Sequence, residues 1–351
     1  MMMREWATQP PEAWYPSLQA LRDSAYDEHN RSRRFRGEVK ALQFGHDGTN
    51  VTLVRPDKGL LDGAKLNHHA FGQICYHLDA PAGALRERSP GLVVDYLNEC
   101  AKDVKPGVQT KLLATRELDQ SVSIKAATGP DYGVIPNYRV AELAQYFNTL
   151  APGFKSPPCW DGRAGGMWLS NRRIVICQID GGSLVDGGGE RDEMYRGYYM
   201  WNSEVGDCKF YIDVFLFRVI CGNLQIWGKT SEFQANNVHR KNAARRFEDE
   251  GISSLRKYLQ SGTHTQLEWI RNAKNMILPA KEPEVIEIGF KRGIPKQTMV
   301  KAIALANEEE GKCENMWELV QGGTAFARDL PYADDRIALS TQFGKLMELA
   351  Q

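Results

Sequence analysis

The clearest alternation of hydrophobic and polar positions lies in residues 195–221, where two aromatic and β-branched runs follow each other. The sequence SEVGD between them contains a Gly and two acids, which is typical of a short hairpin loop. In the register that such a loop favours, Trp201 lies opposite Phe210. The pattern therefore predicts a β-hairpin whose two faces differ in character.

One face of this hairpin is apolar enough to be core and carries Tyr195, Tyr199, Trp201, Phe210, Ile212, Val214 and Leu216. The other face carries Arg196, Tyr198, Asn202, Lys209, Tyr211 and Asp213. Aromatic rings flanked by cations on an exposed sheet stack unpaired bases, at about 1–3 kcal/mol per base. Tyr198, Tyr211, Arg196 and Lys209 are therefore predicted to bind nucleic acid. Two alternatives stay open: a three-residue loop would exchange the faces, or helices cover both faces and the rings are core.

The first half of the chain mixes short helices with short strands. Helical patterns cover residues 17–30, 64–78 and 91–103. Strand patterns are VKALQFG with NVTLVRP, TKLLATREL with SVSIKAAT, and MWLSN with RRIVICQI. A turn and a helix follow in DYGVIPNYRVAELAQYFNTL, where Leu143, Phe147 and Leu150 form one stripe.

After the hairpin the pattern becomes helical. Helices are predicted at 236–260, 263–278, 296–310, 313–328 and 334–349, and LPAKEPEVIEIG is interpreted as a linker. Strands followed by helices indicate an α+β fold with antiparallel hairpins and a helical C-terminal region, in contrast to regular βαβ alternation. We expect a core domain over residues 1–280 and a helical region over 281–351.

Composition and charge narrow the class of protein. Of 351 residues, 42% are hydrophobic, and 44 Lys and Arg balance 44 Asp and Glu, so the chain is unlike proteins that coat duplex DNA by charge alone. Seven scattered cysteines without a CxxC pair indicate a reduced, intracellular protein. The start, MMMREWATQPPEAW, lacks the apolar core of a signal peptide. No segment approaches the roughly 20 apolar residues of a membrane helix.

Two runs of basic residues are candidate phosphate contacts. In the predicted helix, His239, Lys241, Asn242, Arg245 and Arg246 share one side. Such a face displaces counterions from phosphates, and Arg240, Lys241, Arg245 and Arg246 are the residues expected to hold them. The alternative is a solvated helix whose charges Glu248, Asp249 and Glu250 offset. The second run, Arg31, Arg33, Arg34 and Arg36 with Phe35, is interpreted as an arm on an acidic partner or as a charged connection.

Metal and catalytic patterns are weak. Asp186, Glu190, Asp192 and Glu193 followed by Asp207-Cys208-Lys209 resemble the acid and Asp-x-Lys spacing of Mg²⁺-dependent nucleases. The loop 181–193 is better explained by glycine flexibility than by phosphate binding, because it lacks a GK[ST] ending. His68, His69, Cys75 and His77 cannot close one tetrahedral site, since Cys75 and His77 point about 200° apart on a helix. No catalytic residue and no cofactor is predicted.

The blocks DYGVIPNYRVAEL, YRGYYMWNSEVGD, FLFRVICGN and MWELVQGGTAFARDLPYADDR resemble the phage/plasmid-like protein family, curated as domain of unknown function 932. The resemblance covers most of the chain, best from about residue 130 onwards. It implies a protein of phages, plasmids and integrated elements, in the cytoplasm of a bacterial host. It assigns no active residue.

These observations together predict a non-enzymatic protein of a mobile element that binds nucleic acid, with single-stranded DNA favoured. It would serve recombination, replication or protection of DNA, and self-association into rings or filaments would multiply weak contacts along a strand. The alternatives are a metal-dependent nuclease that uses Asp186 or Glu190 with Asp207 and Lys209, and a protein-binding inhibitor of a host defence factor.

Overall fold

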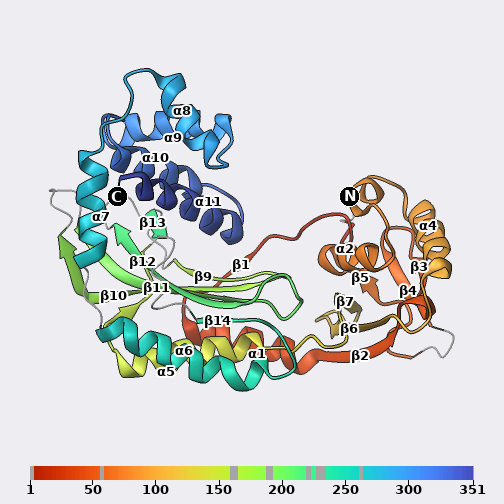
Figure 1. Cartoon of the computed structure of the whole chain (residues 1–351). Coiled ribbons are helices and arrows are strands. Elements are labelled where there is room, and N and C mark those ends of the chain that lie inside the picture. The colour runs from red at the N-terminus through yellow and green to blue at the C-terminus, as the bar shows by residue number, and fades with distance from the viewer. Residues whose placement is uncertain are drawn as a thin grey trace.

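The computed structural model describes residues 4–55, 59–158, 165–186, 193–218, 223–226, 235–260 and 264–350. It has two separate, mainly antiparallel sheets, each packed with helices, and a cluster of helices at the C-terminal end (Figure 1). The α+β class is therefore confirmed. None of the helices in these ranges is both long and apolar enough to cross a membrane.

The smaller sheet has six strands in the order β2-β6-β7-β5-β4-β3. Its strands are β2 Ser32–Glu38, β3 Gln43–His46, β4 Val51–Val54, β5 Lys65–Leu66, β6 Gln109–Arg116 and β7 Val122–Thr128. The predicted hairpins β3–β4 and β6–β7 are confirmed. β5 runs parallel to β7, as the exception to the antiparallel pairing.

Helices of the same part of the chain pack on this sheet: α2 His68–His77, α3 Ala82–Arg86 and α4 Pro90–Asp103, with the 3₁₀ turn η1 Val39–Ala41. Their core includes Trp6, Phe44, Phe71 and Leu97, all buried. The helix predicted from residue 64 begins four residues later, because 65–66 pair with β7 and Asn67 caps the helix by accepting from the Ala70 backbone.

The larger sheet has the order β1-β9-β10-β11-β12-β13, with β8 on β10 and β14 on β12. Its strands are β1 Ala13–Trp14, β8 Phe154–Lys155, β9 Met167–Leu169, β10 Ile174–Asp186, β11 Glu193–Asn202, β12 Phe210–Arg218, β13 Asn223–Ile226 and β14 Ala235–Asn237. Three helices lie beneath one face: α1 Leu18–Arg31, α5 Asn137–Leu150 and α6 Ala243–Gln260 (Figure 1). The opposite face contacts Ala333 and Ile337 of the helical tail. Both faces are therefore covered.

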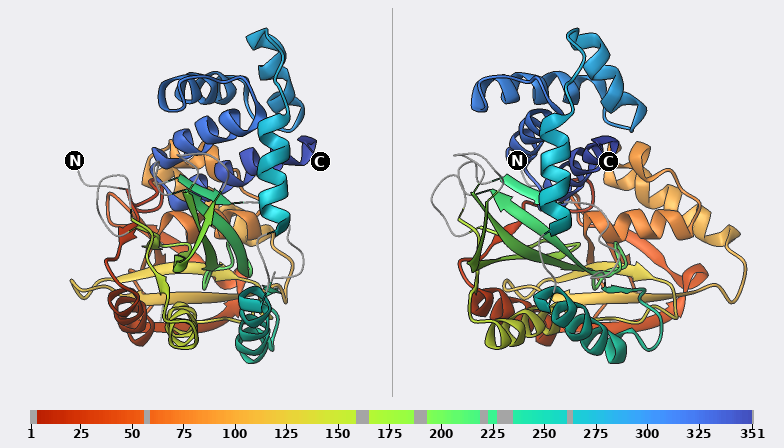
Figure 2. Two further views of the ribbon diagram at one scale, coloured as in Figure 1. Left: turned by 90° about the vertical axis from the view of Figure 1, so that its left-hand side faces the viewer. Right: turned by 60° about the vertical axis from the view of Figure 1, so that its left-hand side comes forward.

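The C-terminal helices form a further core above the larger sheet (Figures 1 and 2). They are α7 His264–Asn275, α8 Glu282–Lys291, α9 Lys296–Glu309, α10 Met316–Arg328, α11 Ala333–Leu346 and the 3₁₀ turn η2 Met347–Ala350. The interpretation of LPAKEPEVIEIG as a linker is wrong, since α8 occupies it. Its Pro lies in the first helical turn together with Glu282 and Glu284, which is a helix start signal. Because α7 shares this core, the predicted division at residue 280 stays a prediction.

The two sheets are joined along one side of the molecule by α1, which continues directly into β2 (Figure 1). The turn between β11 and β12 makes a second junction. Its Val205 is buried against Leu113 and Ala126 of the smaller sheet, and Glu204 forms an ion pair with Arg34 of β2 at 3.1 Å. The hairpin therefore reaches across to the other sheet and does not end in solvent.

The hairpin register differs by one residue from the expected one. Trp201 pairs with Tyr211, where the sequence predicted Phe210. The connection is longer than expected because the Ser203 hydroxyl accepts from the backbone of Val205 and Asp207, and Gly206 turns the chain with φ +81°. Each residue of β11 therefore lies opposite the β12 residue one position further along the chain than expected.

Candidate nucleic-acid interface and the adjoining pocket

The aromatic platform predicted on the hairpin is not exposed. Tyr198 is 0% exposed, its ring meets Phe147 and Phe154 edge-on, and its hydroxyl donates to Asn148 Oδ1 at 3.3 Å. Burial raises the pKa of Tyr198 well above its ordinary value. The prediction that Tyr198 stacks bases is therefore wrong, since α5 covers its face of the sheet.

The other platform residues are largely engaged within the protein. Arg196 donates to the Tyr258 carbonyl at 2.8 Å and lies 4.3 Å from the centre of that ring. Tyr211 stacks on Trp201 at 4.9 Å and donates its hydroxyl to Asp213 at 2.9 Å. Tyr211 is half-buried. These contacts give the rings and the arginine a structural role in packing.

Lys209 is the exception among the four predicted platform residues. Its side chain is exposed, and its Nζ lies 5.7 Å from the centre of the Tyr211 ring. Among its predicted platform residues, the hairpin thus presents one exposed cation, without the exposed aromatic pair that base stacking requires.

The basic segment before α6 is folded differently from the prediction. β14 and a turn occupy the first part of the expected helix, which begins only at Ala243. His239 is 7% exposed. Its ring stacks on Tyr132 at 4.8 Å, and its Nδ1 lies 2.8 Å from the Gly133 carbonyl. His239 therefore does not belong to an exposed basic face, and burial lowers its pKa.

A close backbone approach anchors this segment. The Gly133 N–H donates to the His239 carbonyl at 3.0 Å. A Cβ atom at position 133 would lie 1.8 Å from the Arg240 carbonyl oxygen, so only glycine fits there. The contact holds Arg240 and Lys241 beside the turn of residues 129–133.

The same turn receives cations from the smaller sheet. Arg36 of β2 donates to the Pro130 carbonyl at 3.5 Å, and Lys111 of β6 donates to the Tyr132 carbonyl at 2.8 Å. Lys241 contacts Asp131 at 3.1 Å, although both side chains are about three-quarters exposed. An exposed pair of this kind is weak and leaves the lysine available.

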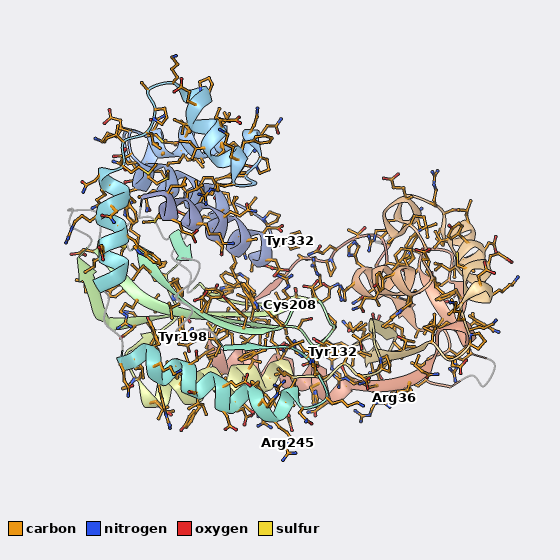
Figure 3. The ribbon with its side chains drawn as sticks, viewed as in Figure 1. Arg36, Tyr132, Tyr198, Cys208, Arg245 and Tyr332 are labelled. Atoms are coloured by element: carbon orange, nitrogen blue, oxygen red, sulfur yellow. The ribbon has the colours of Figure 1, made fainter. Side chains whose placement is uncertain are left out.

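The two basic runs thus meet on one side of the molecule, and we call the region they form the basic surface. It consists of Arg36, Lys111, Arg240 and Lys241 around this turn, together with the exposed Arg245 and Arg246 in the first turn of α6, which follow them in the chain. Figure 3 shows Arg36 and Arg245 on the same side of the molecule, with Arg245 directed away from the ribbon. Burial lowers the pKa of Lys111, and Arg36 and Arg34 lower it further, as expected where cations gather.

The remaining arginines of the first run have internal partners. Arg31 donates to the Arg116 carbonyl at 2.6 Å, Arg33 donates to the Ser32 carbonyl at 2.8 Å, and Arg34 pairs with Glu204. Arg31 ends α1, and the rest of the run lies in strand β2, which pairs with β6 along its length. It is therefore part of a sheet and not a free arm.

The residues proposed for a nuclease do not form a metal site in the described ranges. The Asp207 carboxylate accepts from Arg172 at 2.7 Å and also from Arg173. Burial tends to raise its pKa, but the two arginines lower it overall. No group of three or more His, Cys, Asp or Glu side chains is placed to hold a metal ion in that part of the chain.

Most of the acidic loop 181–193 lies outside the described residues. Residues 187–192, which include Glu190 and Asp192, are outside the described ranges, as are the three consecutive glycines. β10 extends through Asp186 and pairs with Glu193 of β11. The notion of a metal in this loop therefore stays a prediction.

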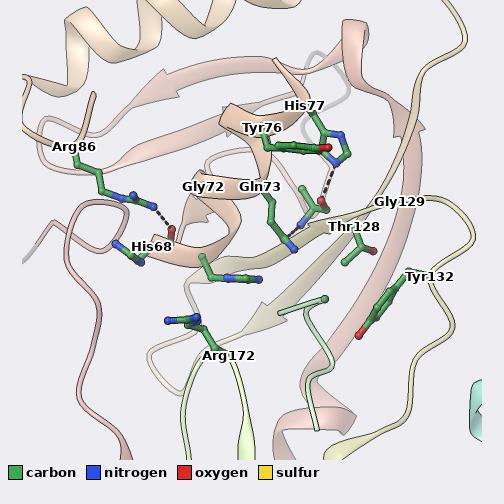
Figure 4. A pocket seen from close by; sticks show the side chains of 13 residues that line it. His68, Gly72, Gln73, Tyr76, His77, Arg86, Thr128, Gly129, Tyr132 and Arg172 are labelled. Atoms are coloured by element: carbon green, nitrogen blue, oxygen red, sulfur yellow. Dashed lines mark hydrogen bonds between the residues drawn. The ribbon is translucent and has the colours of Figure 1, made fainter. Parts of the chain in front are cut away.

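A pocket of about 540 Å³ lies beside the turn of residues 129–132, between α2 and two turns of the larger sheet (Figure 4). It is lined by His68, His69, Gly72, Gln73, Tyr76, His77, Arg86, Ala127, Thr128, Gly129, Tyr132, Arg172 and Gly206. No Asp or Glu is among these residues. Of these residues, the sequence pattern had singled out the histidines alone.

The walls of the pocket are held by hydrogen bonds. Gln73 donates to the Val205 carbonyl at 2.6 Å and accepts from the Ala127 N–H at 2.8 Å. His69 Nε2 lies 3.0 Å from the same Val205 carbonyl, and His77 Nε2 lies 2.9 Å from the Ala127 carbonyl. The histidines therefore join α2 to its neighbours separately, which agrees with the exclusion of a shared tetrahedral metal site.

Comparisons with known proteins found no family model, no curated protein and no solved structure that matches this chain. The resemblance to the phage/plasmid-like family therefore stays a prediction from sequence blocks, and the function rests on the chemistry of the surface and the pocket.

Proposed function

We propose that this protein binds nucleic acid, with single-stranded DNA favoured, through the basic surface. The observation that carries the proposal is the meeting of Arg36 with Lys241 and its neighbours at one turn, although the two runs are far apart in sequence. A cluster of cations gains affinity for a phosphate backbone because each contact releases condensed counterions. A chain with zero net charge needs such a local cluster to bind nucleic acid at all.

The preference for a single strand is supported by an exposed aromatic side chain. Tyr76 of α2 is 84% exposed and lines the same pocket as Gly129 and Tyr132 of the 129–132 turn. Unstacked bases are available to such a ring in a single strand and are hidden in a duplex. The buried Tyr198 no longer supports this preference.

The biological setting is proposed from the sequence blocks. A protein of a phage or plasmid with this activity would act in recombination, replication or protection of DNA in the bacterial cytoplasm. Self-association along a strand would raise the avidity of a small basic surface.

Fluorescence anisotropy tests the proposal with the full chain, a labelled single strand and the matching duplex, across a salt series. Lys241→Ala/Arg245→Ala should weaken binding and reduce the salt slope by about 0.7 per lost cation for a single strand. Arg36→Ala should add a further reduction of similar size. A matched control is Lys281→Ala/Lys291→Ala at the two ends of α8, which removes two exposed cations that do not belong to the basic surface.

Three results would contradict the proposal. Wild-type protein without affinity at low salt would exclude nucleic acid, and capture of one stoichiometric host protein would then favour an inhibitor. Unchanged salt slopes in both basic-surface variants would remove that surface. Cleavage of the labelled strand in Mg²⁺ or Mn²⁺ would support the nuclease alternative.

A further inference from the structure

The pocket beside α2 has a basic side formed by Arg86, Arg172 and His68. Arg86 donates to the His68 carbonyl at 3.0 Å and lies 5.6 Å from the centre of the Phe71 ring. Its Nε is buried without a hydrogen-bond partner in the described structure, and it forms no ion pair with the described residues. A buried donor of this kind usually has a water or an ion as its partner.

Two further groups add to this side. Arg172 faces the pocket from the turn between β9 and β10, where Asp207 holds its guanidinium at 2.7 Å. Burial lowers the pKa of His68 to about 4, and Arg86, Arg172 and His69 contribute to the decrease. Asp207 offsets the charge of Arg172, so Arg86 is the guanidinium group of this side without a carboxylate partner among the described residues.

The other side of the pocket is aromatic. In Figure 4, Tyr76, His77 and Tyr132 lie opposite His68, Arg86 and Arg172. Tyr76 is 84% exposed, whereas the apolar positions of the same helix, such as Phe71 and Ile74, are fully buried. The cavity of about 540 Å³ is within the range of small-ligand sites, which often lie between domains.

We propose that this pocket binds a nucleotide, with its terminal phosphate beside Arg86, Arg172 and His68 and its base against Tyr76. Guanidinium groups bind phosphate by charge-assisted hydrogen bonds, and an exposed tyrosine offers a stacking face to any base. No Asp or Glu lines the pocket, although Asp207 pairs with Arg172, and this lining favours an anionic ligand over a cationic one.

Two sources provide this chemistry: a free mononucleotide and the 5′-phosphorylated end of a strand. The inference does not require the basic surface, because none of the residues that line the pocket belongs to that surface. The two proposals therefore fail separately. Lys241→Ala/Arg245→Ala should leave mononucleotide binding unchanged.

Isothermal titration calorimetry on the full chain tests the pocket with deoxyadenosine 5′-monophosphate, deoxyadenosine and inorganic phosphate. Arg86→Gln should weaken binding of the monophosphate roughly ten-fold or more, since a charge-assisted bond is lost. Tyr76→Ala should weaken it roughly ten-fold through lost stacking. Arg88→Gln and Tyr96→Ala are matched controls in α3–α4, exposed and outside the pocket, and should bind as wild type does.

The source of the ligand is identified by oligonucleotides with and without a 5′-phosphate. Preference for the phosphorylated strand, lost in Arg86→Gln, supports the pocket as a strand-end site, and binding of the free monophosphate alone supports a mononucleotide site. No binding of either at millimolar concentration, or equal binding by Arg86→Gln, overturns the proposal.

A measurement on the wild-type protein tests the proposal even if the Arg86→Gln variant fails to fold. In wild type, the NMR titration of the His68 imidazole should shift to higher pH when the monophosphate is bound, because an anion favours the charged ring. An unshifted titration at saturating ligand overturns the pocket assignment.

Discussion

The hairpin β11–β12 and the pocket beside α2 both contain tyrosines and arginines, yet one is closed and the other is open. Tyr198 is fully buried and Arg218 is 1% exposed, whereas Tyr76 is 84% exposed. Arg218 pairs with Glu310 at 2.5 Å, but Arg86 meets no carboxylate among the described residues. Residue types alone therefore do not distinguish a packed core from a binding site, because the covering elements decide which groups reach solvent.

The largest expected effect separates the two tyrosines. Tyr198→Ala should lower the free energy of unfolding by about 3–5 kcal/mol, since it removes a fully buried ring and leaves a cavity. Tyr76→Ala should change it by less than about 0.5 kcal/mol, as at other exposed positions. Urea unfolding followed by circular dichroism measures both values. Equal effects of the two substitutions would contradict the contrast between a closed and an open region.

A slightly smaller effect is expected where the closed region holds a charge pair. Arg218 of β12 donates to both carboxylate oxygens of Glu310 and to Gln321. Arg218→Met should cost about 3 kcal/mol, near the low end for a broken buried pair, because the Glu310 side chain keeps 9% exposure.

The double variant Arg218→Met/Glu310→Met sharpens this measurement. It should recover most of the loss, since no unpaired charge then stays buried. Lys281→Ala breaks the exposed pair with Glu284 and is the control, with an expected cost below about 1 kcal/mol. A double variant as unstable as the single one would assign the loss to packing instead of charge.

The smallest effect is expected in the pocket and depends on pH. The folded-state pKa of His68 is lowered to about 4, by burial first and then by Arg86, Arg172 and His69. The unfolded chain takes up a proton near pH 6.5 and the folded protein does not, so stability should fall as pH decreases from about 6.5 to 4. A difference of one bound proton limits the change in the free energy of unfolding to about 1.4 kcal/mol per pH unit. Because the His68 ring is half-exposed, we expect a change well below this limit.

Urea unfolding at several pH values in this window checks the prediction. His68→Gln should flatten the dependence, whereas His46→Gln, an exposed position of β3, should not. A dependence that persists in His68→Gln would assign the pH effect to other groups.

Much of the fold was predictable because local patterns agree with the final packing. The helix α1, the hairpins β3–β4 and β6–β7, and four of the five tail helices occur close to where their periodicity predicts them. The fifth, α8, was missed because its segment was interpreted as a linker, although a Pro in the first helical turn is a helix start signal. The boundaries of α2 and α6 shifted where a short strand took the first residues of the expected helix.

The candidate site was predictable only in part. Arg36, Lys241 and Arg245 were visible as basic residues, but no sequence pattern indicated that they share a surface. The pocket combines Arg86 and Arg172 with Tyr76, and neither arginine has a local signal. Tyr76 alone had one, because it lies off the apolar stripe of α2.

The sequence by itself determined the alternation of the strands, the stripes of the helices and the balance of charge, because these follow from residue order and backbone geometry. Tertiary structure decided which of these faces remained open. α5 covers Tyr198, Glu310 neutralises Arg218, and the turn of residues 129–133 brings two basic runs together. Such outcomes depend on contacts between residues distant in the chain, and solvent access is a property of those contacts.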